Sequence, residues 1–378
     1  MVYKNRAKAQ RSLQLGAPRL RYSGRFCVVR ATGPCCAVYL CRGEGLLRDP
    51  FLPTSRLNLE STHTSHYAQG RFMKWSIAFL ATFLALFSTQ PIARATKPQT
   101  PSTHDRAFWR NILKDNYRVP QGQQVFPLIQ ELSTYLGSPD PELRDEITYT
   151  LIYAWIAYQK QLSPAELITL LDEWQSNLRI SIGEKNTDTV LRRSFSALCL
   201  AVLAERDLKT PFLGADRYRT LLDNALNYSQ HEQDLRGFDP VKGWIHPTAH
   251  TADLLLFLAK NPFFTVADQH RLLQAISQRL ASANLIYTYG EQDRLAVAAV
   301  AVISRPDFDA PYFQSWLATL DATDSNVWKS TPPDDHLLKT LQNNNYLLES
   351  LAARLYAEPK SHAITAALDQ VTQILGKR

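Results

Sequence analysis

Apolar residues recur with a helical period along most of this chain, beginning near Asp105. Leu143, Ile147, Leu151 and Trp155 are four residues apart, which places them on one face of a helix. Similar runs follow one another toward the C-terminus, and alternation typical of a strand occurs only at Leu285–Tyr289. We therefore expect roughly a dozen helices of ordinary length with short connections between them.

Helix start signals support the same interpretation. Ser163-Pro164-Ala165-Glu166 has the form of a capping box with proline in the first turn, and Thr265–Asp268 has the same start-signal form. Many consecutive helices with short loops pack as antiparallel pairs. The predicted fold is all-α, with antiparallel helix pairs arranged as a helical-repeat (HEAT-like) solenoid or as an α/α array.

A second beginning lies inside the chain, at Met73. The segment MKWSIAFLATFLALFSTQPIARA has one lysine, a short apolar run and a small-x-small ending at Ala95, which together are typical of a secretory signal peptide. We expect translation to start at Met73 and cleavage to follow Ala95, which predicts a periplasmic or secreted protein. The apolar run is too short for a comfortable membrane span, so no stable span is expected after cleavage.

This leader sets the predicted domain organisation. Residues 1–72 are expected to be a spurious or disordered extension, 73–95 the signal peptide, and 96–104 a polar linker. Residues 105–306 are predicted to form the main helical domain, and residues 307–378 to add helices that cap the same domain.

Charge and cysteine content change once the extension is set aside. The chain has 42 Lys and Arg against 35 Asp and Glu, but residues 1–95 contain 14 of the basic and 3 of the acidic residues. The remaining 28 basic and 32 acidic residues give a net charge of −4, so we exclude nucleic-acid binding. Only Cys199 of the five cysteines lies beyond the leader, in an apolar run that predicts a buried, inert thiol.

The polar residues that could carry chemistry are densest between Glu232 and Asp253. Pro247 suits a first helical turn, so His246, His250 and Asp253 fall at i, i+4 and i+7 on one helix face. Two imidazoles and a carboxylate on one face could hold a divalent metal or act as a base with its orienting acid. The metalloprotease pattern H-E-x-x-H is excluded, because proline replaces the glutamate. The structural alternative is that His250 donates a hydrogen bond to a carboxylate and so joins two helices.

Several segments resemble the bacterial domain-of-unknown-function 2785 family (DUF2785). They are LRDEITYTLIYAWI at Leu143–Ile156, IGEKNTDTVLRRSFSALCLA at Ile182–Ala201, EQDLRGFDPVKGWIHPTAHTADLL at Glu232–Leu255 and YTYGEQDRLAVA at Tyr287–Ala298. The similarity spans about residues 108–305 and includes the family's His-x3-His-x2-Asp element. It implies an all-helical domain and no particular activity.

The same motifs supply further candidates for ligand binding, which are polar or aromatic residues near predicted helix starts. They are Arg144, Asp188, Arg193, Glu232, Asp234, Arg236, Trp244, Asp293 and Arg294. Helix N-termini in stacked repeats tend to share one edge, so these residues could converge on a surface for an anionic or peptide ligand. They could equally pair with one another as a structural polar spine.

Two functions remain open from the sequence, and it does not decide whether the protein is an enzyme. The first is an exported binding module for a protein, a peptide or a small anionic ligand, with no cofactor. The second is a metal-dependent or acid/base hydrolase that uses His246, His250 and Asp253. Phosphate-binding loops and nucleophile-elbow motifs are absent from the sequence.

Overall fold

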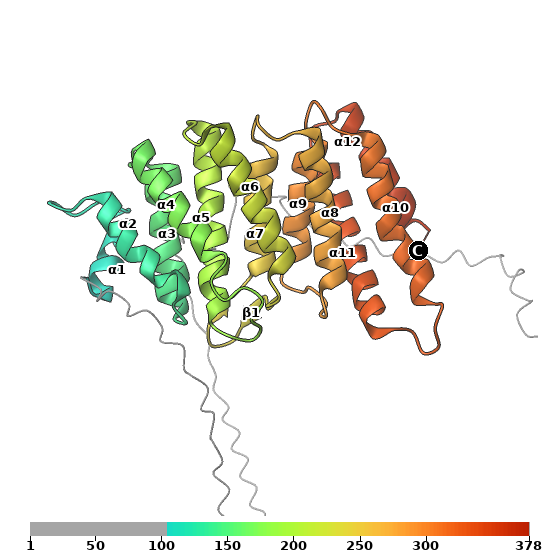
Figure 1. The fold of residues 1–378 in the computed structure, drawn as a ribbon, viewed down its shortest axis with the longest axis horizontal. Helices are drawn as coiled ribbons and strands as arrows, with labels where there is room; N and C mark the ends of the chain where they lie inside the picture. The colour runs from blue at the N-terminus through green and yellow to red at the C-terminus, as the bar shows by residue number, and fades with distance from the viewer. Residues whose placement is uncertain (1–103, 378) are drawn as a thin grey trace, which may run out of the picture. The chain divides into compact units, whose positions relative to one another are not determined.

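The computed structural model describes residues 104–377, and the predicted leader and N-terminal extension lie outside these residues. The described part is all-α apart from one very short hairpin (Figure 1). The elements are α1 (Arg106–Lys114), α2 (Val125–Thr134), a 3-10 turn η1 (Tyr135–Gly137), a π-helical segment η2 (Glu142–Tyr149), α3 (Thr150–Tyr153), a second π-helical segment η3 (Ala154–Tyr158), α4 (Pro164–Asn177), α5 (Thr189–Lys209), α6 (Gly214–His231), β1 (Phe238–Asp239), β2 (Gly243–Trp244), α7 (Pro247–Ala259), α8 (Val266–Ser282), α9 (Glu291–Ile303), α10 (Ala310–Val327), α11 (Asp335–Ala357) and α12 (His362–Leu375).

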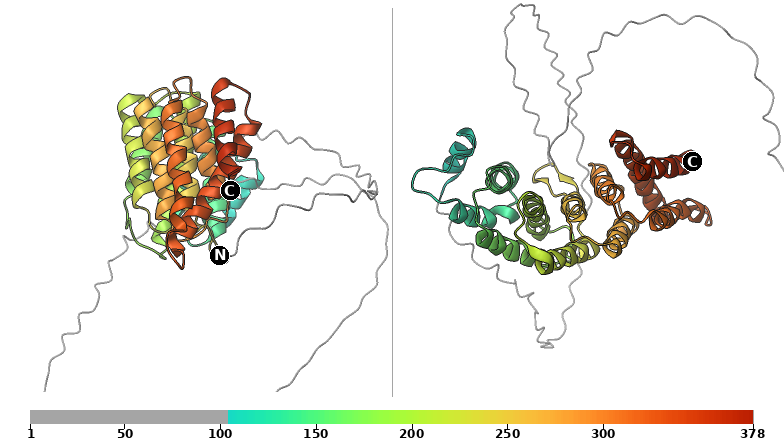
Figure 2. Two further views of the ribbon diagram at one scale, coloured as in Figure 1. Left: turned by 90° about the vertical axis from the view of Figure 1, so that its right-hand side faces the viewer. Right: turned by 90° about the horizontal axis from the view of Figure 1, so that it is seen from above.

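The helices alternate between two layers. α5, α7, α9 and α11 pack side by side in one layer, and α4, α6, α8 and α10 lie behind them in the other, as the view from above shows (Figure 2). Because each short loop crosses from one layer to the other, consecutive helices run antiparallel and the helices of one layer run parallel. This confirms the all-α fold class.

The parallel course of α5, α7 and α9 brings their N-termini to one side of the layers. We call this side the loop edge; it comprises residues 178–188, 232–246 and 283–290. Contacts join these segments: Asn186 N donates to Asp234 Oδ2 at 2.9 Å, and the rings of Phe238 and Tyr289 lie 6.0 Å apart. The expected gathering of helix N-termini is therefore present.

Local sequence signals act as expected at most helix starts. Ser163 and Glu166 form a complete capping box at α4, and Thr265 and Asp268 form another at α8. His246 is the N-cap of α7, with Pro247 in the first turn. The alternating segment Leu285–Tyr289 is an irregular loop, because its backbone pairs with no strand and Tyr287 N instead donates to the side chain of Asn343 at 2.9 Å.

The core lies between and within the two layers. Small residues such as Ala296, Ala298 and Ala299 on α9 let neighbouring helices approach closely. All thirteen residues of α7 are buried, as expected for a helix surrounded by other helices. Cys199 is fully buried, and burial raises the pKa of its thiol, in agreement with the predicted inert cysteine. No helix among residues 104–377 is long and apolar enough to cross a membrane.

Candidate functional site

Residues 232–246 connect α6 to α7 along the loop edge and contain the β1–β2 hairpin (Figure 1). Gly243 in this hairpin has a φ of 71°, and a Cβ added there would lie 2.9 Å from Cβ of Pro141. A side chain at this position would meet both backbone strain and a steric clash. The hairpin can therefore pack directly against the start of η2.

A buried ion pair fixes the beginning of this segment. Arg193 on α5 donates from Nε to Glu232 Oε2 at 2.6 Å and from Nη2 to Oε1 at 3.0 Å. Its Nη1 donates to the carbonyl oxygens of Ile180 and Ser181, each at 3.0 Å. Both charged side chains are almost completely buried, so the bidentate pair joins α5 to the loop edge and is closed to solvent.

Asp234 and Arg236 form a second internal pair two residues further on. Arg236 donates from Nη2 to Asp234 Oδ2 at 2.6 Å and to the carbonyl oxygen of Thr187 at 2.9 Å. Asp234 is buried, whereas about a quarter of the Arg236 side chain (27%) is exposed. This pair ties residues 232–246 to the loop before α5.

Arg144 holds the hairpin through its backbone. The side chain is fully buried and donates from Nη1 to the carbonyl oxygen of Ser138, and from Nη2 to those of Lys242 and Trp244, at 2.6 to 2.9 Å. Its guanidinium also lies over the ring of Phe195, 4.7 Å from the centroid. Arg144 thus acts as a scaffold for the hairpin.

The predicted residues on α9 point to two different neighbours. Arg294 forms a salt bridge with the buried Asp253 on α7. Asp293 instead pairs with Arg354 on α11, where both side chains are more than a third exposed. These two pairs therefore link α9 to the helices on either side of it within one layer.

The predicted arginines and carboxylates therefore gather along the loop edge and its adjoining helix starts, mostly in internal pairs. Asp188 belongs to the same set, because Lys242 Nζ donates to its Oδ1 at 2.5 Å. Of the two arrangements that the sequence left open, the contacts are those of a polar spine. Ligand binding by these residues stays a prediction.

His250 lies at the centre of the buried polar set and is 1% exposed. The hydroxyl of Ser194 donates to the carbonyl oxygen of Ile245, so it must accept from Nδ1 of His250, 2.8 Å away. The imidazole also packs edge-on against Phe195, with centroids 4.9 Å apart. Burial keeps the pKa of His250 well below its ordinary value, and the ring is neutral at pH 7. The expected buried, hydrogen-bonded histidine is confirmed, but the expected carboxylate partner is wrong, because the acceptor is the Ser194 hydroxyl.

His246 is buried in a different way. Its backbone is left-handed, with a φ of 48°, and neither ring nitrogen has a hydrogen-bond partner among the described residues. Trp244 stacks on the ring with centroids 4.4 Å apart. Burial, with a smaller contribution from Arg294, lowers the pKa of His246 to about 4. Buried polar atoms without a hydrogen-bond partner are rare in native structures, so His246 is a candidate functional residue.

Glu291 is the site residue that sequence reasoning missed. Its Oε1 lies 3.8 Å from Nε2 of His246, and its Oε2 accepts from the backbone N of Tyr289 at 2.9 Å. The side chain is 2% exposed, and burial raises its pKa. A Cβ added to Gly237 would lie 2.4 Å from Oε1, so glycine is needed there. The signal that could have found Glu291 is its position in the first turn of α9, at the same edge as His246.

An aromatic surface, defined as Phe238, Trp244 and Tyr289, covers this histidine and glutamate. Phe238 and Trp244 meet edge-on at 4.9 Å between centroids, and Tyr289 lies about equally far from both, at 6.0 and 6.1 Å. Phe238 is 40% and Tyr289 47% exposed. Large aromatic side chains thus face solvent directly above a rigid polar base.

No group of three or more His, Cys, Asp and Glu side chains that could hold a metal ion occurs within residues 104–377. The rings of His246 and His250 meet edge-on at 5.8 Å between centroids, and Asp253 is occupied by Arg294. His246, His250 and Asp253 therefore do not point at one common position where a metal ion could bind. Metal binding there stays a prediction.

The fold and this edge define a class: an all-α protein of two helical layers that presents a buried polar spine and an exposed aromatic surface. The model of the family described as "Protein of unknown function (DUF2785)" matches residues 178–353. The resemblance expected from the motifs is confirmed with shifted limits, because the match omits the motif at Leu143–Ile156 and extends through most of α11. Comparisons with curated proteins and with solved structures find no match.

Proposed function

We propose that this chain is an exported binding module, built as a HEAT-like helical-repeat solenoid, that takes a protein or peptide partner on its aromatic surface. The alternating layers support the repeat assignment, because each helix pair contacts mainly the pairs before and after it. Export rests on the leader at residues 73–95. The HEAT-like arrangement, the export and the binding role are therefore proposals, whereas the all-α fold class is observed.

One observation carries the binding proposal: the exposed Phe238 and Tyr289 and the partly exposed Trp244 stand on a backbone that cannot easily move. Phe238 and Trp244 belong to a hairpin whose carbonyl groups are held by the buried Arg144, and Tyr289 precedes the buried Glu291. Rigid, exposed Trp and Tyr side chains are typical of the residues that dominate binding energy at protein interfaces. Binding to such a surface costs little conformational entropy, because its side chains and backbone are already ordered.

The internal pairing favours a protein or peptide over a small anion at this place. Arg144 and Arg193 make their strong hydrogen bonds inside the protein and are fully buried. An anion could reach them only by breaking those bonds. The exposed side chains Phe238 and Tyr289 remain for a partner, and both are aromatic.

Site-specific photo-crosslinking tests this proposal. Benzoylphenylalanine replaces Phe238 in one variant and Tyr356, which is 74% exposed on α11, in the control. In intact cells we expect a discrete crosslinked product from position 238 and none from position 356. Absence of a product at 238, or equal yields at both positions, would reject the aromatic surface as a binding site.

A second candidate, acid/base hydrolysis, is favoured by a single observation. His246 has two unpaired ring nitrogens beside Glu291, a carboxylate whose pKa burial raises. A neutral imidazole next to a carboxyl group could relay a proton. Both residues are buried, and Trp244 stacks on His246. This favours the binding module instead, because a substrate would have to displace Trp244 to reach the imidazole.

Esterase and glycosidase assays with nitrophenyl substrates test the hydrolase. Under that hypothesis, hydrolysis by the purified protein is lost in both His246→Asn and Glu291→Gln and retained in His231→Ala, a change at an exposed histidine. Equal rates in all four proteins would exclude the hydrolase for these substrates.

A further inference from the structure

A second place on the molecule has the chemistry of a ligand site: a groove between the last turns of α6 and α8. It encloses about 380 Å³, and its lining includes Ser229, Gln278, Arg279 and Ser282. Both helices belong to the layer opposite α7, so the groove is separate from the aromatic surface. Its volume lies in the range of small-molecule sites.

The lining of this groove includes Arg279, a buried arginine that has no acidic partner among the described residues. The residue is 5% exposed, yet within residues 104–377 its guanidinium forms no ion pair with a carboxylate. Arg279 contacts Glu232, but both carboxylate oxygens of Glu232 accept hydrogen bonds from Arg193. Arg279 reaches only the backbone there, donating from Nη1 to the Glu232 carbonyl oxygen at 2.8 Å.

The phenol of Tyr287 lies near the same guanidinium but supplies no negative charge. Burial raises the pKa of Tyr287, and the nearby Arg279 opposes that rise only in part. The phenol is therefore neutral at pH 7, and its oxygen lies 3.2 Å from the Thr248 hydroxyl. A buried positive charge without a counter-charge is unfavourable, which is the reason buried arginines are nearly always paired.

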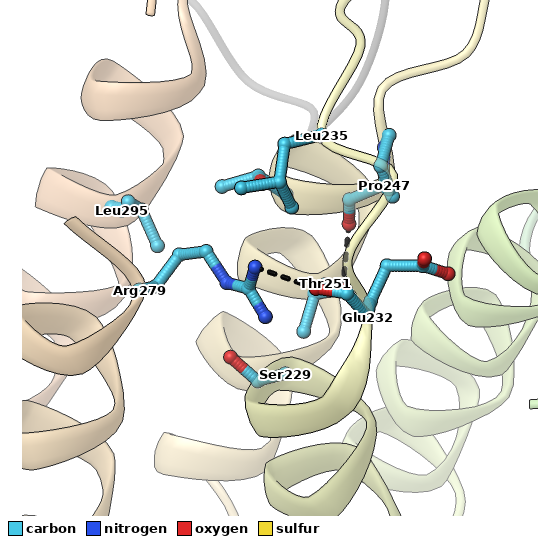
Figure 3. A pocket seen from close by; sticks show the side chains of 8 residues that line it. Ser229, Glu232, Leu235, Pro247, Thr251, Arg279 and Leu295 are labelled. Carbon is cyan, nitrogen blue, oxygen red and sulfur yellow. Dashed lines mark hydrogen bonds between the residues drawn. The ribbon is translucent and has the colours of Figure 1, made fainter. Parts of the chain in front are cut away.

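Figure 3 shows the inner side of Arg279. There the side chain borders a small cavity of about 10 Å³ that Thr251, Pro247 and Leu295 help to line. This space is no larger than a single water requires. The hydroxyl of Ser229 lies near the guanidinium and makes no hydrogen bond to the other residues drawn. Ser229 and Arg279 line both this cavity and the groove, so a ligand larger than water must approach them from the groove.

We propose that the groove binds a small monocarboxylate, with its carboxylate on Arg279 and the Ser229 hydroxyl. Among the described residues of the lining, Arg279 is the only charged one, so a single negative charge balances it and a phosphate dianion would not. The planar guanidinium matches a planar carboxylate through two parallel hydrogen bonds. Ala275, Ala281 and glutamine amides surround the remaining space and suit a neutral body.

This site does not depend on the aromatic surface, and the two can fail separately. Calorimetric titration with N-acetylalanine tests it, with the methyl ester of N-acetylalanine as the uncharged probe. We expect saturable binding of the acid and none of the ester. Arg279→Gln should weaken binding at least tenfold, whereas Arg217→Gln, which removes a half-exposed arginine from α6, should leave it unchanged.

A second variant keeps the test decisive if Arg279→Gln does not fold. Ala281→Trp places an indole at an exposed position in the groove and leaves the arginine intact, so it should abolish binding without unfolding the protein. Two further probes identify the source of the carboxylate. Binding of trialanine but not trialaninamide would indicate a peptide C-terminus, and binding of N-acetylalanine alone would indicate a free small acid.

Three outcomes overturn the proposal. They are no binding of either carboxylate to the wild-type protein, equal binding by wild type and Ala281→Trp, and inorganic phosphate binding as tightly as N-acetylalanine.

Discussion

At the scale of single residues, the buried polar side chains divide into those that are paired and those that are not. His250 donates a hydrogen bond to the Ser194 hydroxyl, which in turn donates to the carbonyl oxygen of Ile245 in the loop edge. His246 itself is unpaired and is held by aromatic stacking and by its backbone. The first histidine is therefore explained by stability, and the second is the better functional candidate.

Replacement of His250 should destabilise the fold. In His250→Ala the Ser194 hydroxyl loses a donor and Phe195 loses its edge-on contact, which together should lower the free energy of unfolding by about 2–4 kcal/mol. Urea denaturation measures this, with the exposed His231→Ala as control. Metal analysis of the same proteins should find no metal that depends on His250. Unchanged stability would mean that this segment does not pack as described.

The two buried histidines also predict the pH dependence of stability. The pKa of His246 is about 4 in the folded protein and near 6.5 in the unfolded chain, so below pH 6.5 the unfolded chain binds the extra proton. Its contribution is fully present above pH 6.5 and should fall by about 1.4 kcal/mol per pH unit toward pH 4. Asp145 changes the stability in the opposite direction, because burial raises its pKa to about 6. Its contribution to the free energy of unfolding is therefore lost as the pH rises through that value.

Comparison with variants separates these two opposing terms. The free energy of unfolding of wild type minus that of His246→Asn should decrease from pH 6.5 to pH 4.5, since asparagine tolerates the left-handed backbone and does not titrate there. The corresponding difference for Asp145→Asn should increase over the same range. If the difference in the free energy of unfolding between wild type and His246→Asn did not change with pH, the assigned burial of His246 would be wrong.

At the scale of elements, the hairpin in the loop edge depends on Arg144, whose hydrogen bonds go to backbone carbonyl groups. Arg144→Met should leave the carbonyl groups of Ser138, Lys242 and Trp244 without their donor and lower the free energy of unfolding by about 3 kcal/mol or more. Amide exchange should accelerate most in residues 238–246. Arg179→Met, at an exposed position, is the control for the lost charge. Unaltered exchange in the hairpin would show that Arg144 does not hold it.

Helix boundaries were largely readable from sequence because caps are local. Ser163 and Glu166 lie three residues apart, and the hydrogen bonds they exchange need no tertiary partner. The hairpin of β1 and β2 was not predicted, because each strand has only two residues and the side chain that holds its backbone, Arg144, lies about 100 residues earlier in η2. The same reason explains why Leu285–Tyr289 reads as a strand and is a loop.

At the scale of the whole molecule, the leader gives a prediction that can be checked on native protein. If Met73 is the start and cleavage follows Ala95, N-terminal sequencing should find Thr96 as the first residue, and the protein should be recovered from the periplasm or medium. Peptides from residues 1–72 in the mature protein would reject this start site.

The same start site implies that residues 1–72 contribute nothing to folding. The apolar period begins only near Asp105, so a protein that starts at Thr96 should melt at the same temperature as the full chain. A clear fall in melting temperature on removal of the extension would contradict this.

The motifs of the sequence resemble the DUF2785 family, whose model matches residues 178–353. The sequence by itself also determined the all-α class, most helix starts and the burial of Cys199 and His250. These follow from spacing and composition, which act over a few residues. Only the tertiary structure decided which charges are paired, since Arg193 and Glu232 are 39 residues apart and meet through the alternation of the layers. It alone placed Glu291 beside His246 and, within residues 104–377, left Arg279 without an acidic partner. Pairing depends on distances between helices, which no local pattern encodes.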